Sequence, residues 1–301
     1  MLTEIYFYVD EFCKQNQLFL LSLLKENGYY KKKHSATLTL SEVMTILIYY
    51  HYSHYKDFKS YYLHMVSKQL YRDFPDLVSY HRFLELMPRA LFAMSLFLKN
   101  RCRQAHQTGI YYMDSSPLAV SDAKRVHQHR TFKGLANWGK TSVGWFYGFK
   151  YHILINHRGE LLRFYFTKAC VSDNNAKVLF FLTKGLQGSL FADKGYLMSQ
   201  DKKAFIEQEG LKVIVKAKKN AKKQAPMDIY EKAYLHKRAV IESVIALHKQ
   251  VATIEHTRHR SPVNAFTHMM AALTAYSFYP QKPVVNITPE QWMIQHQPMA
   301  A

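Results

Sequence analysis

The pattern of hydrophobic and polar residues changes its period once along the chain, close to residue 105. Before that point apolar residues recur at helical spacing, as at Ile5, Val9 and Phe12. Thr39 and Glu42 form a capping-box pattern at the start of another apolar helical segment. The sequence therefore predicts that residues 1–105 form an all-α N-terminal region.

Beyond residue 105 the pattern is that of strands mixed with helices. Apolar residues alternate with Gly148, Lys150 and His152 at a period of two, which predicts a strand. Strands are expected over residues 109–114, 147–155, 161–168, 189–193 and 212–216, and helices over residues 174–186, 202–210, 237–249 and 263–279. This order predicts a mixed α/β layer fold over residues 106–285, followed by a C-terminal tail over residues 286–301.

The predicted helix over residues 237–249 has an apolar and a charged stripe. Apolar residues at i, i+4 and i+7 from Val240 form the first stripe. Arg238, Glu242 and Lys249 form the second, within roughly 40° of one another at about 100° per residue. A lone acid between two bases on a helix is commonly a solvated salt bridge of small energetic value. Glu242 becomes a candidate for chemistry only together with two acids upstream.

Those two acids end predicted strands. Asp114 ends the strand that begins at Gly109, and Asp193 ends the strand in FADKGY. Carboxylates at the carboxyl ends of strands can converge with a helical carboxylate in the crevice above a sheet. Mg²⁺ takes oxygen ligands, and a pair of such ions can activate the attacking oxygen and stabilise the leaving oxygen at phosphorus. Asp114, Asp193 and Glu242 are therefore the candidate catalytic and metal-binding residues.

The charge of the chain favours a polyanion as its partner. There are 41 Lys and Arg against 22 Asp and Glu, a formal net charge of +19, and nucleic acid is the first candidate. Two windows without acids, between Asp122 and Glu160 and between Glu209 and Asp228, predict surfaces for DNA phosphates. The candidate DNA-binding residues are Lys124, Arg125, Lys194, Lys218, Lys219, Lys222, Lys223, Arg238, Lys249, Arg258 and Arg260.

Other classes of protein are disfavoured by composition. No apolar run approaches the roughly 18 residues that a membrane-spanning helix needs. The three cysteines are far apart, which predicts neither a disulfide framework nor a zinc site. We expect a soluble cytoplasmic protein without a membrane partner.

Five segments together carry a resemblance to a known family: Met-Asp-Ser-Ser-Pro-Leu-Ala-Val from Met113, GWFYGFKYHILIN, FADKGY, KRAVIESV and IEHTRHRS. They resemble bacterial insertion-sequence transposases of the DDE type, most closely the group called insertion sequence nine-eighty-two within the insertion-sequence-four-like superfamily. The resemblance covers residues 110–283. It implies a ribonuclease-H-like catalytic domain with a mixed sheet and flanking helices, cleavage of the element's ends and strand transfer into target DNA. It also implies two Mg²⁺ ions in each active site, for which Mn²⁺ can substitute.

The resemblance extends to single residues. By motif match, the family's acidic triad falls on Asp114, Asp193 and Glu242. Arg238 and Lys249 keep the spacing of the family's Tyr-Arg-Glu-Lys signature around Glu242, whereas the preceding tyrosine, Tyr234, lies one residue too far away.

The resemblance also implies partners and a location. The expected partners are double-stranded DNA, as terminal repeats and as target, and further copies of the chain in a synaptic complex. The expected location is the nucleoid in the bacterial cytoplasm. Residues 1–105 are expected to recognise the element's ends and to pair protomers.

Three other functions are compatible with parts of the sequence. A metal-dependent DNA nuclease without strand transfer would use the same acids, and a non-catalytic DNA-binding relative would use only the basic surfaces. A tyrosine recombinase could use HTRHR and Tyr276, although Tyr276 belongs to an apolar helical segment. Asp173, just before a predicted helix, is interpreted as the cap of that helix, and the alternative is a residue that supports the site acids from behind.

Overall fold

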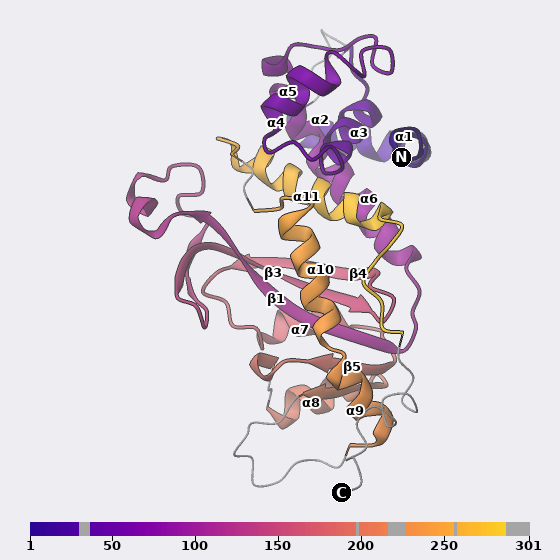
Figure 1. The fold of residues 1–301 in the computed structure, drawn as a ribbon, viewed down its shortest axis with the longest axis vertical. Coiled ribbons are helices and arrows are strands. Elements are labelled where there is room, and N and C mark those ends of the chain that lie inside the picture. Colours follow the sequence, from indigo (N-terminus) through magenta and orange to yellow (C-terminus); the bar gives the residue numbers. More distant parts are fainter. Residues whose placement is uncertain (30–36, 197–198, 216–226, 256–257, 287–301) are drawn as a thin grey trace, which may run out of the picture. The chain divides into compact units, whose positions relative to one another are not determined.

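Contacts between distant segments divide the chain into two units, both of which are drawn in Figure 1. The structure is a computed structural model and describes residues 1–29, 37–196, 199–215, 227–255 and 258–286. The first unit, which we call the helical unit, comprises residues 1–103, 130–133 and 247–280. The second, which we call the sheet unit, comprises residues 104–129, 134–246 and 281–301. Each unit therefore combines segments that are far apart in the sequence.

The regular elements described in the helical unit are helices. They are α1 (Leu2–Gln15), α2 (Gln17–Glu26), α3 (Leu40–Tyr50), α4 (Phe58–Ser60), a π-helix (Tyr61–Val66), α5 (Tyr80–Leu86), a 3₁₀ helix (Met87–Arg89), α6 (Ala90–Gln104) and α11 (Pro262–Phe278). The predicted capping box at α3 is confirmed. The Thr39 hydroxyl accepts a hydrogen bond from the backbone N–H of Glu42, and the Glu42 carboxylate accepts one from the N–H of Thr39.

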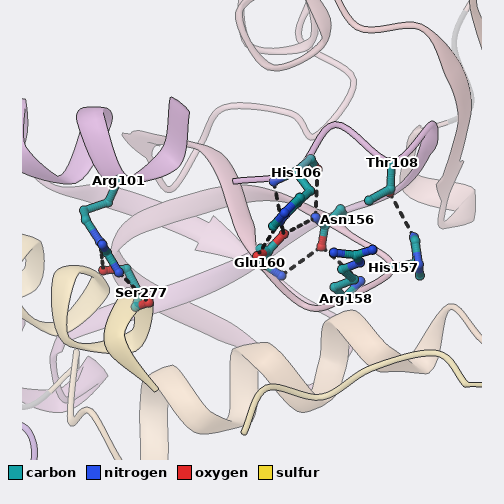
Figure 2. A network of polar contacts seen from close by, with 8 residues as sticks. All are labelled: Arg101, His106, Thr108, Asn156, His157, Arg158, Glu160 and Ser277. Atoms are coloured by element: carbon teal, nitrogen blue, oxygen red, sulfur yellow. Dashed lines mark hydrogen bonds and ion pairs between the residues drawn. The ribbon is translucent and has the colours of Figure 1, made fainter. Parts of the chain in front are cut away.

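The last helix of this unit, α11, is held to the earlier helices by polar contacts as well as by packing. The Tyr52 hydroxyl donates a hydrogen bond to the carbonyl of Ala275 at 2.6 Å. The guanidinium of Arg101 donates to the carbonyl of Ser277 at 3.3 Å (Figure 2). It also lies 4.4 Å from the centre of the Phe278 ring. The end of α11 is thus tied to α6 and to the turn after α3, both of which precede it by more than 150 residues.

Three histidine rings lie together in the helical unit. His51 and His268 are buried with ring centres 4.7 Å apart, and His259 lies 5.3 Å from His268. Burial lowers the pKa of His51 to about 3 and that of His259 to about 4, and it holds the pKa of His268 well below its usual value. Because desolvation disfavours the protonated ring, these side chains are neutral at neutral pH.

A six-stranded mixed sheet is the centre of the sheet unit. Its strands are β1 (Ile110–Ser121), β2 (Asn137–Lys140), β3 (Trp145–Asn156), β4 (Leu161–Lys168), β5 (Gly188–Ala192) and β6 (Leu211–Val215). β1 pairs with β3 in the antiparallel sense and with β5 in the parallel sense, and β5 pairs in parallel with β6. β3 also pairs antiparallel with β2 and β4. The five predicted strands are present, and the short β2 adds to them.

Helices cover both faces of the parallel part of the sheet. They are α7 (Ala176–Thr183), α8 (Gln200–Glu207), α9 (Ile229–His236) and the first part of α10 (Ala239–Gln250). Tyr111 and Met113 of β1 share a core cluster with side chains of α7 and α8. Tyr112 points to the opposite face, where its hydroxyl donates to the backbone carbonyl of Tyr234 in α9. The sequence did not predict α9, and the mixed α/β layer fold is confirmed.

A polar network closes the β3–β4 turn over the start of β1 (Figure 2). The Glu160 carboxylate accepts hydrogen bonds from the Asn156 amide at 2.6 Å and from the backbone N–H of His106 at 3.1 Å. Burial acts to raise the pKa of Glu160, but the hydrogen bonds from Asn156 and His106 outweigh it and hold that pKa below its usual value. Glu160 is therefore an ionised carboxylate with a structural use.

The strand that carries Asp114 is longer than the sequence predicts. β1 continues to Ser121, so the prediction that Asp114 ends its strand is wrong, whereas Asp193 does follow directly on β5. The extension is explained by β3, which pairs with β1 along almost its whole length. In the described part of the chain, no helix has the length and hydropathy that crossing a membrane requires.

Candidate active site

The pairing of β1 with β5 brings two of the predicted acids to neighbouring positions. The two strands run parallel and in register up to Met113, which lies opposite Ala192. Asp114 and Asp193 are the next residues along the two paths. Because side chains alternate between the faces of a sheet, both acids belong to the face that Tyr112 shares with α9.

The guanidinium of Arg238 is the point where the three predicted acids meet. Its Nη2 atom lies 2.8 Å from Glu242 Oε1 and 3.9 Å from Asp193 Oδ1, and its Nη1 atom lies 3.4 Å from Asp114 Oδ2. The Arg238 side chain is only 18% exposed, so these ion pairs are screened less than surface pairs would be. The structure thus gathers the three predicted acids around one positive charge.

The local structure explains how Arg238 and Glu242 come together. Lys237 follows the last residue of α9, and α10 begins two residues later at Ala239. The helix predicted over residues 237–249 is therefore confirmed with a slightly later start. Arg238 and Glu242 are four residues apart at this start, so their side chains are neighbours on one side of the helix. Val244 faces the other way and is fully buried.

Asp114 is the most buried of the three acids. Its side chain is 20% exposed, against 47% for Asp193 and 57% for Glu242. Burial raises the pKa of Asp114 to about 6. The backbone N–H of Ser115, which donates to Asp114 Oδ1 at 2.8 Å, and the charge of Arg238 lower that pKa, while the two other carboxylates raise it. A carboxyl group that titrates near neutral pH beside like charges is typical of a functional site.

The donor atoms of this site suit a hard divalent cation. All three acids offer carboxylate oxygens, which Mg²⁺ and Mn²⁺ prefer. Within the described residues, no group of three His, Cys, Asp or Glu side chains is arranged to hold one ion. The carboxylates share the charge of Arg238 instead. The residues therefore fit a divalent ion by their chemistry, at a place where the guanidinium balances their charge.

The other predicted DNA-binding residues fall into three groups. Those that are exposed in the structure are Lys124, Arg125, Lys194, Arg258 and Arg260. Those that lie outside the described residues are Lys218, Lys219, Lys222 and Lys223. Lys249 is half-buried in the helical unit and forms an ion pair with Glu255 at 2.7 Å.

Two lysines of the acid-free windows have protein partners of their own. Lys150 is 12% exposed at its side chain and pairs with Asp173, and Lys212 pairs with the buried Glu231. Asp173 and Glu231 lie outside the windows in the sequence. A window defined by local charge therefore overstates the basic surface, because acids from elsewhere in the fold neutralise part of it.

The favoured sequence interpretation of Asp173 does not match the structure. The prediction that it caps the next helix is wrong, because the Asn175 side chain caps α7. Asp173 Oδ1 instead accepts hydrogen bonds from Ser115 Oγ at 2.7 Å and from Lys150 Nζ at 3.1 Å. The available signal was Lys150 itself, since a charged residue within a predicted strand of a core needs a partner.

The tyrosine of the recombinase alternative is buried. Tyr276 lies in α11 with no exposed surface, and its ring packs edge-on against His248 with ring centres 4.4 Å apart. A nucleophilic tyrosine must reach a phosphodiester, so this position does not favour that function.

The comparison with protein families gives the class of this chain. The family model described as a transposase DDE domain matches residues 104–262, which is more than half of the chain. The chain belongs to the transposase DDE domain family. No curated protein and no solved structure matches the chain. The matched residues include Asp114, Asp193, Arg238 and Glu242, and the family makes DNA the expected substrate.

Proposed function

We propose that this chain is an insertion-sequence transposase of the nine-eighty-two type, within the insertion-sequence-four-like superfamily. It cuts double-stranded DNA at the ends of its element and joins the freed 3′ ends to target DNA. Asp114, Asp193 and Glu242 are the catalytic acids and hold two Mg²⁺ ions, for which Mn²⁺ can substitute. The observation that carries the proposal is the convergence of these acids on Arg238 in a chain of the transposase DDE family.

The fold we propose for the sheet unit is ribonuclease-H-like. Its support is the order of the strands, in which β4, β3 and β1 are antiparallel neighbours and β5 and β6 continue in parallel from β1. The first acid belongs to the central strand β1, and the second follows its parallel neighbour β5. This arrangement provides two carboxylates at one place on the sheet and lets a helix supply the third.

The residues of the site have distinct parts in this proposal. Bound divalent ions would supply activation of the attacking oxygen and neutralisation of charge at the phosphodiester. The Ser115 N–H orients the Asp114 carboxylate, and Arg238 keeps the three acids together against their mutual repulsion. Arg238 is also the cation best placed to meet a phosphate oxygen of the DNA, because guanidinium groups bind phosphates with paired hydrogen bonds.

Several features away from the acids belong to the same proposal. Lys124, Arg125 and Lys194 of the sheet unit and Arg258 and Arg260 of the helical unit contact DNA phosphates, which is supported by their exposure. Residues 1–105 recognise the element's ends and pair protomers in the synaptic complex. The protein acts on the nucleoid of a bacterial cytoplasm.

A strand-transfer assay tests the proposal. The purified full chain is mixed with Mg²⁺ or Mn²⁺, a supercoiled plasmid and a pre-cleaved duplex that ends in the element's terminal repeat. Asp193→Asn serves as the matched inactive variant. We expect wild-type protein to join the duplex to the plasmid, and we expect neither Asp193→Asn nor wild-type protein in EDTA to do so.

Each alternative predicts a different result of this assay. Hydrolysis without a joined product, across several end sequences, would favour the plain nuclease. DNA binding without cutting or joining would favour a non-catalytic relative. A covalent protein–DNA adduct that forms in EDTA and is lost in Tyr276→Phe would establish a tyrosine recombinase. Full activity of Asp193→Asn would remove Asp193 from the site.

A further inference from the structure

Asp173 connects two strands of the sheet unit through one carboxylate oxygen. Its Oδ1 atom accepts from Ser115 Oγ of β1 at 2.7 Å and from Lys150 Nζ of β3 at 3.1 Å. The same ammonium donates to the carbonyl of Val171 at 3.0 Å, in the segment that leads to Asp173. Lys150 thus holds this segment at two points.

The hydrogen bond between Asp173 and Ser115 lies on the face of β1 that is opposite to the Asp114 side chain. Side chains alternate along β1, so Ser115 points to the face of α7 while Asp114 points to the face of α9 and Arg238. Ser115 also uses its backbone N–H to hold Asp114 Oδ1 at 2.8 Å. One residue therefore has its side chain fixed by Asp173 and its N–H fixed on the carboxylate of Asp114.

The second oxygen of Asp173 lies against the turn that follows Asp193. A Cβ atom added at Gly195 would come within 3.5 Å of Asp173 Oδ2, so this backbone passes directly beside the carboxylate. Tyr196, the next residue, is buried. The Asp173 carboxylate thus bonds Ser115, next to one acid, and lies beside the backbone at Gly195, two residues after the other.

We propose that Asp173, with its charge balanced by Lys150, is a positioning residue that sets the relative placement of Asp114 and Asp193. The inference rests on the proposed function, because it assumes that these two acids act together on divalent ions. Asp173 itself is not a ligand in this inference and touches neither DNA nor metal. Residues that orient ligands from behind are worth roughly 10- to 100-fold in metal affinity or activity.

An ion pair that only stabilises the fold is the competing explanation. A partly buried pair such as Lys150–Asp173 is weak evidence for a gain in stability, because desolvation offsets most of the attraction. A purely structural pair would also have no need for the hydroxyl of Ser115. The hydrogen bond between Asp173 and Ser115 is what links the pair to the acid site, so this bond is the one to test.

The test combines two deletions, one rescue and one control. Ser115→Ala removes the hydroxyl but keeps the N–H, Asp173→Ala removes the acceptor, and the double variant removes both. Ser115→Thr restores a hydroxyl on a strand, where threonine is well tolerated. Glu160→Gln is the control, because Glu160 is a similarly exposed carboxylate that bonds His106, before β1, and Asn156, at the end of β3. The readouts are Mn²⁺ binding to the DNA-free protein by electron paramagnetic resonance, kcat and KM for end cutting, and the thermal midpoint.

We expect Ser115→Ala and Asp173→Ala each to weaken Mn²⁺ binding and lower kcat by about 10-fold or more, with KM for DNA unchanged. The double variant should lose no more than Asp173→Ala, because both act through one bond. Ser115→Thr should recover wild-type values, and Glu160→Gln should shift the thermal midpoint alone.

Three results would overturn the inference. The first is a Ser115→Ala variant with wild-type Mn²⁺ binding and wild-type kcat. This variant loses a single hydroxyl group, so it should fold even if Asp173→Ala does not. The second is a double variant whose loss is the product of the two single losses. The third is wild-type protein that neither binds Mn²⁺ nor cuts DNA, which would remove the proposed function as well. In the first two results the wild type is active, so they leave the proposed function standing.

Discussion

The histidine cluster of the helical unit and the acid site of the sheet unit treat buried ionisable side chains in opposite ways. In the helical unit His51 and His268 are packed among rings and held neutral. In the sheet unit Asp114 is packed beside two other carboxylates, but Arg238 supplies a positive charge and Ser115 a hydrogen bond. The first arrangement minimises the number of buried charges, and the second maintains them at a cost in stability. The concentration of charge in the sheet unit supports the proposal that its acids carry out the chemistry.

The largest expected effect is a loss of DNA cutting when one acid of the sheet unit is neutralised. Asp193→Asn keeps the shape of the side chain and removes its charge, so end cutting should fall to less than about one hundredth of the wild-type rate. Affinity for the element's end should stay within a few-fold. Cutting is measured on labelled duplex and binding by fluorescence anisotropy.

The matched change in the helical unit is Asp10→Asn. Asp10, like Asp193, pairs with a basic side chain, Lys14 at 2.7 Å, and it accepts a hydrogen bond from Ser41. The Asp10→Asn substitution should change the rate of end cutting little. If the two variants lost activity equally, the contrast between the units would not be one of function.

The second effect concerns the cost of keeping Asp114 charged. Burial raises its pKa to about 6 from an ordinary value of 3.8. A carboxyl group whose pKa is higher in the folded state destabilises the fold once the pH rises through that window, because the folded state then has to give up a favoured proton. Asp114→Asn should therefore raise the free energy of unfolding at pH 8 in EDTA by up to about 3 kcal/mol, while abolishing cutting.

Denaturant unfolding of both proteins at pH 8 and pH 5 measures this. The gain should shrink at pH 5, where Asp114 is already protonated. A variant that is less stable than wild type at pH 8 would show that the ion pair with Arg238 outweighs the burial of the charge.

The third effect is the loss of stability in acid that the buried histidines of the helical unit should cause. The pKa of His51 is about 3 in the folded state against 6.5 unfolded. A base whose pKa is lower in the folded state gives stability that is complete above pH 6.5 and is lost as the pH falls toward 3. At pH 5 the loss for His51 is about 2 kcal/mol.

Hydrogen exchange, corrected for the intrinsic pH dependence, reports this loss separately in each unit. Between pH 7.5 and pH 5 the amides of α3 and α11 should lose protection more than those of β5 and β6, which contain no histidine. His51→Asn should reduce the loss, whereas His64→Asn, at an exposed position, should leave it unchanged. Equal losses in the two units would contradict the contrast.

The smallest expected effect is a change in the salt dependence of DNA binding, which tests which unit contacts DNA phosphates. Neutralising Lys124 and Arg125 removes two exposed charges from the sheet unit, and neutralising Arg258 and Arg260 removes two from the helical unit. Each phosphate contact contributes about 0.9 to the slope of log affinity against log salt. Each double variant should therefore lower the slope by nearly two, as measured by a salt titration of binding to a duplex. A pair that leaves the slope unchanged lies away from the DNA.

The sequence by itself determined what depends on near neighbours. The period of two in β3, the capping box of Thr39 with Glu42 and the four-residue spacing of Arg238 and Glu242 all appear in the structure as predicted. These features follow from the repeat of a strand or a helix, which fixes where side chains a few residues apart must point. The end of β5 before Asp193 was also readable, because an apolar run stops there.

Only the tertiary structure decided what depends on distant partners. Asp114 lies within a long strand because β3 extends it, and it neighbours Asp193 because β1 and β5 pair in that register. Asp173 pairs with Lys150 because two segments 23 residues apart meet behind the sheet. Such pairings depend on which apolar faces can be buried together over the whole chain. The local period of hydrophobic residues does not determine them.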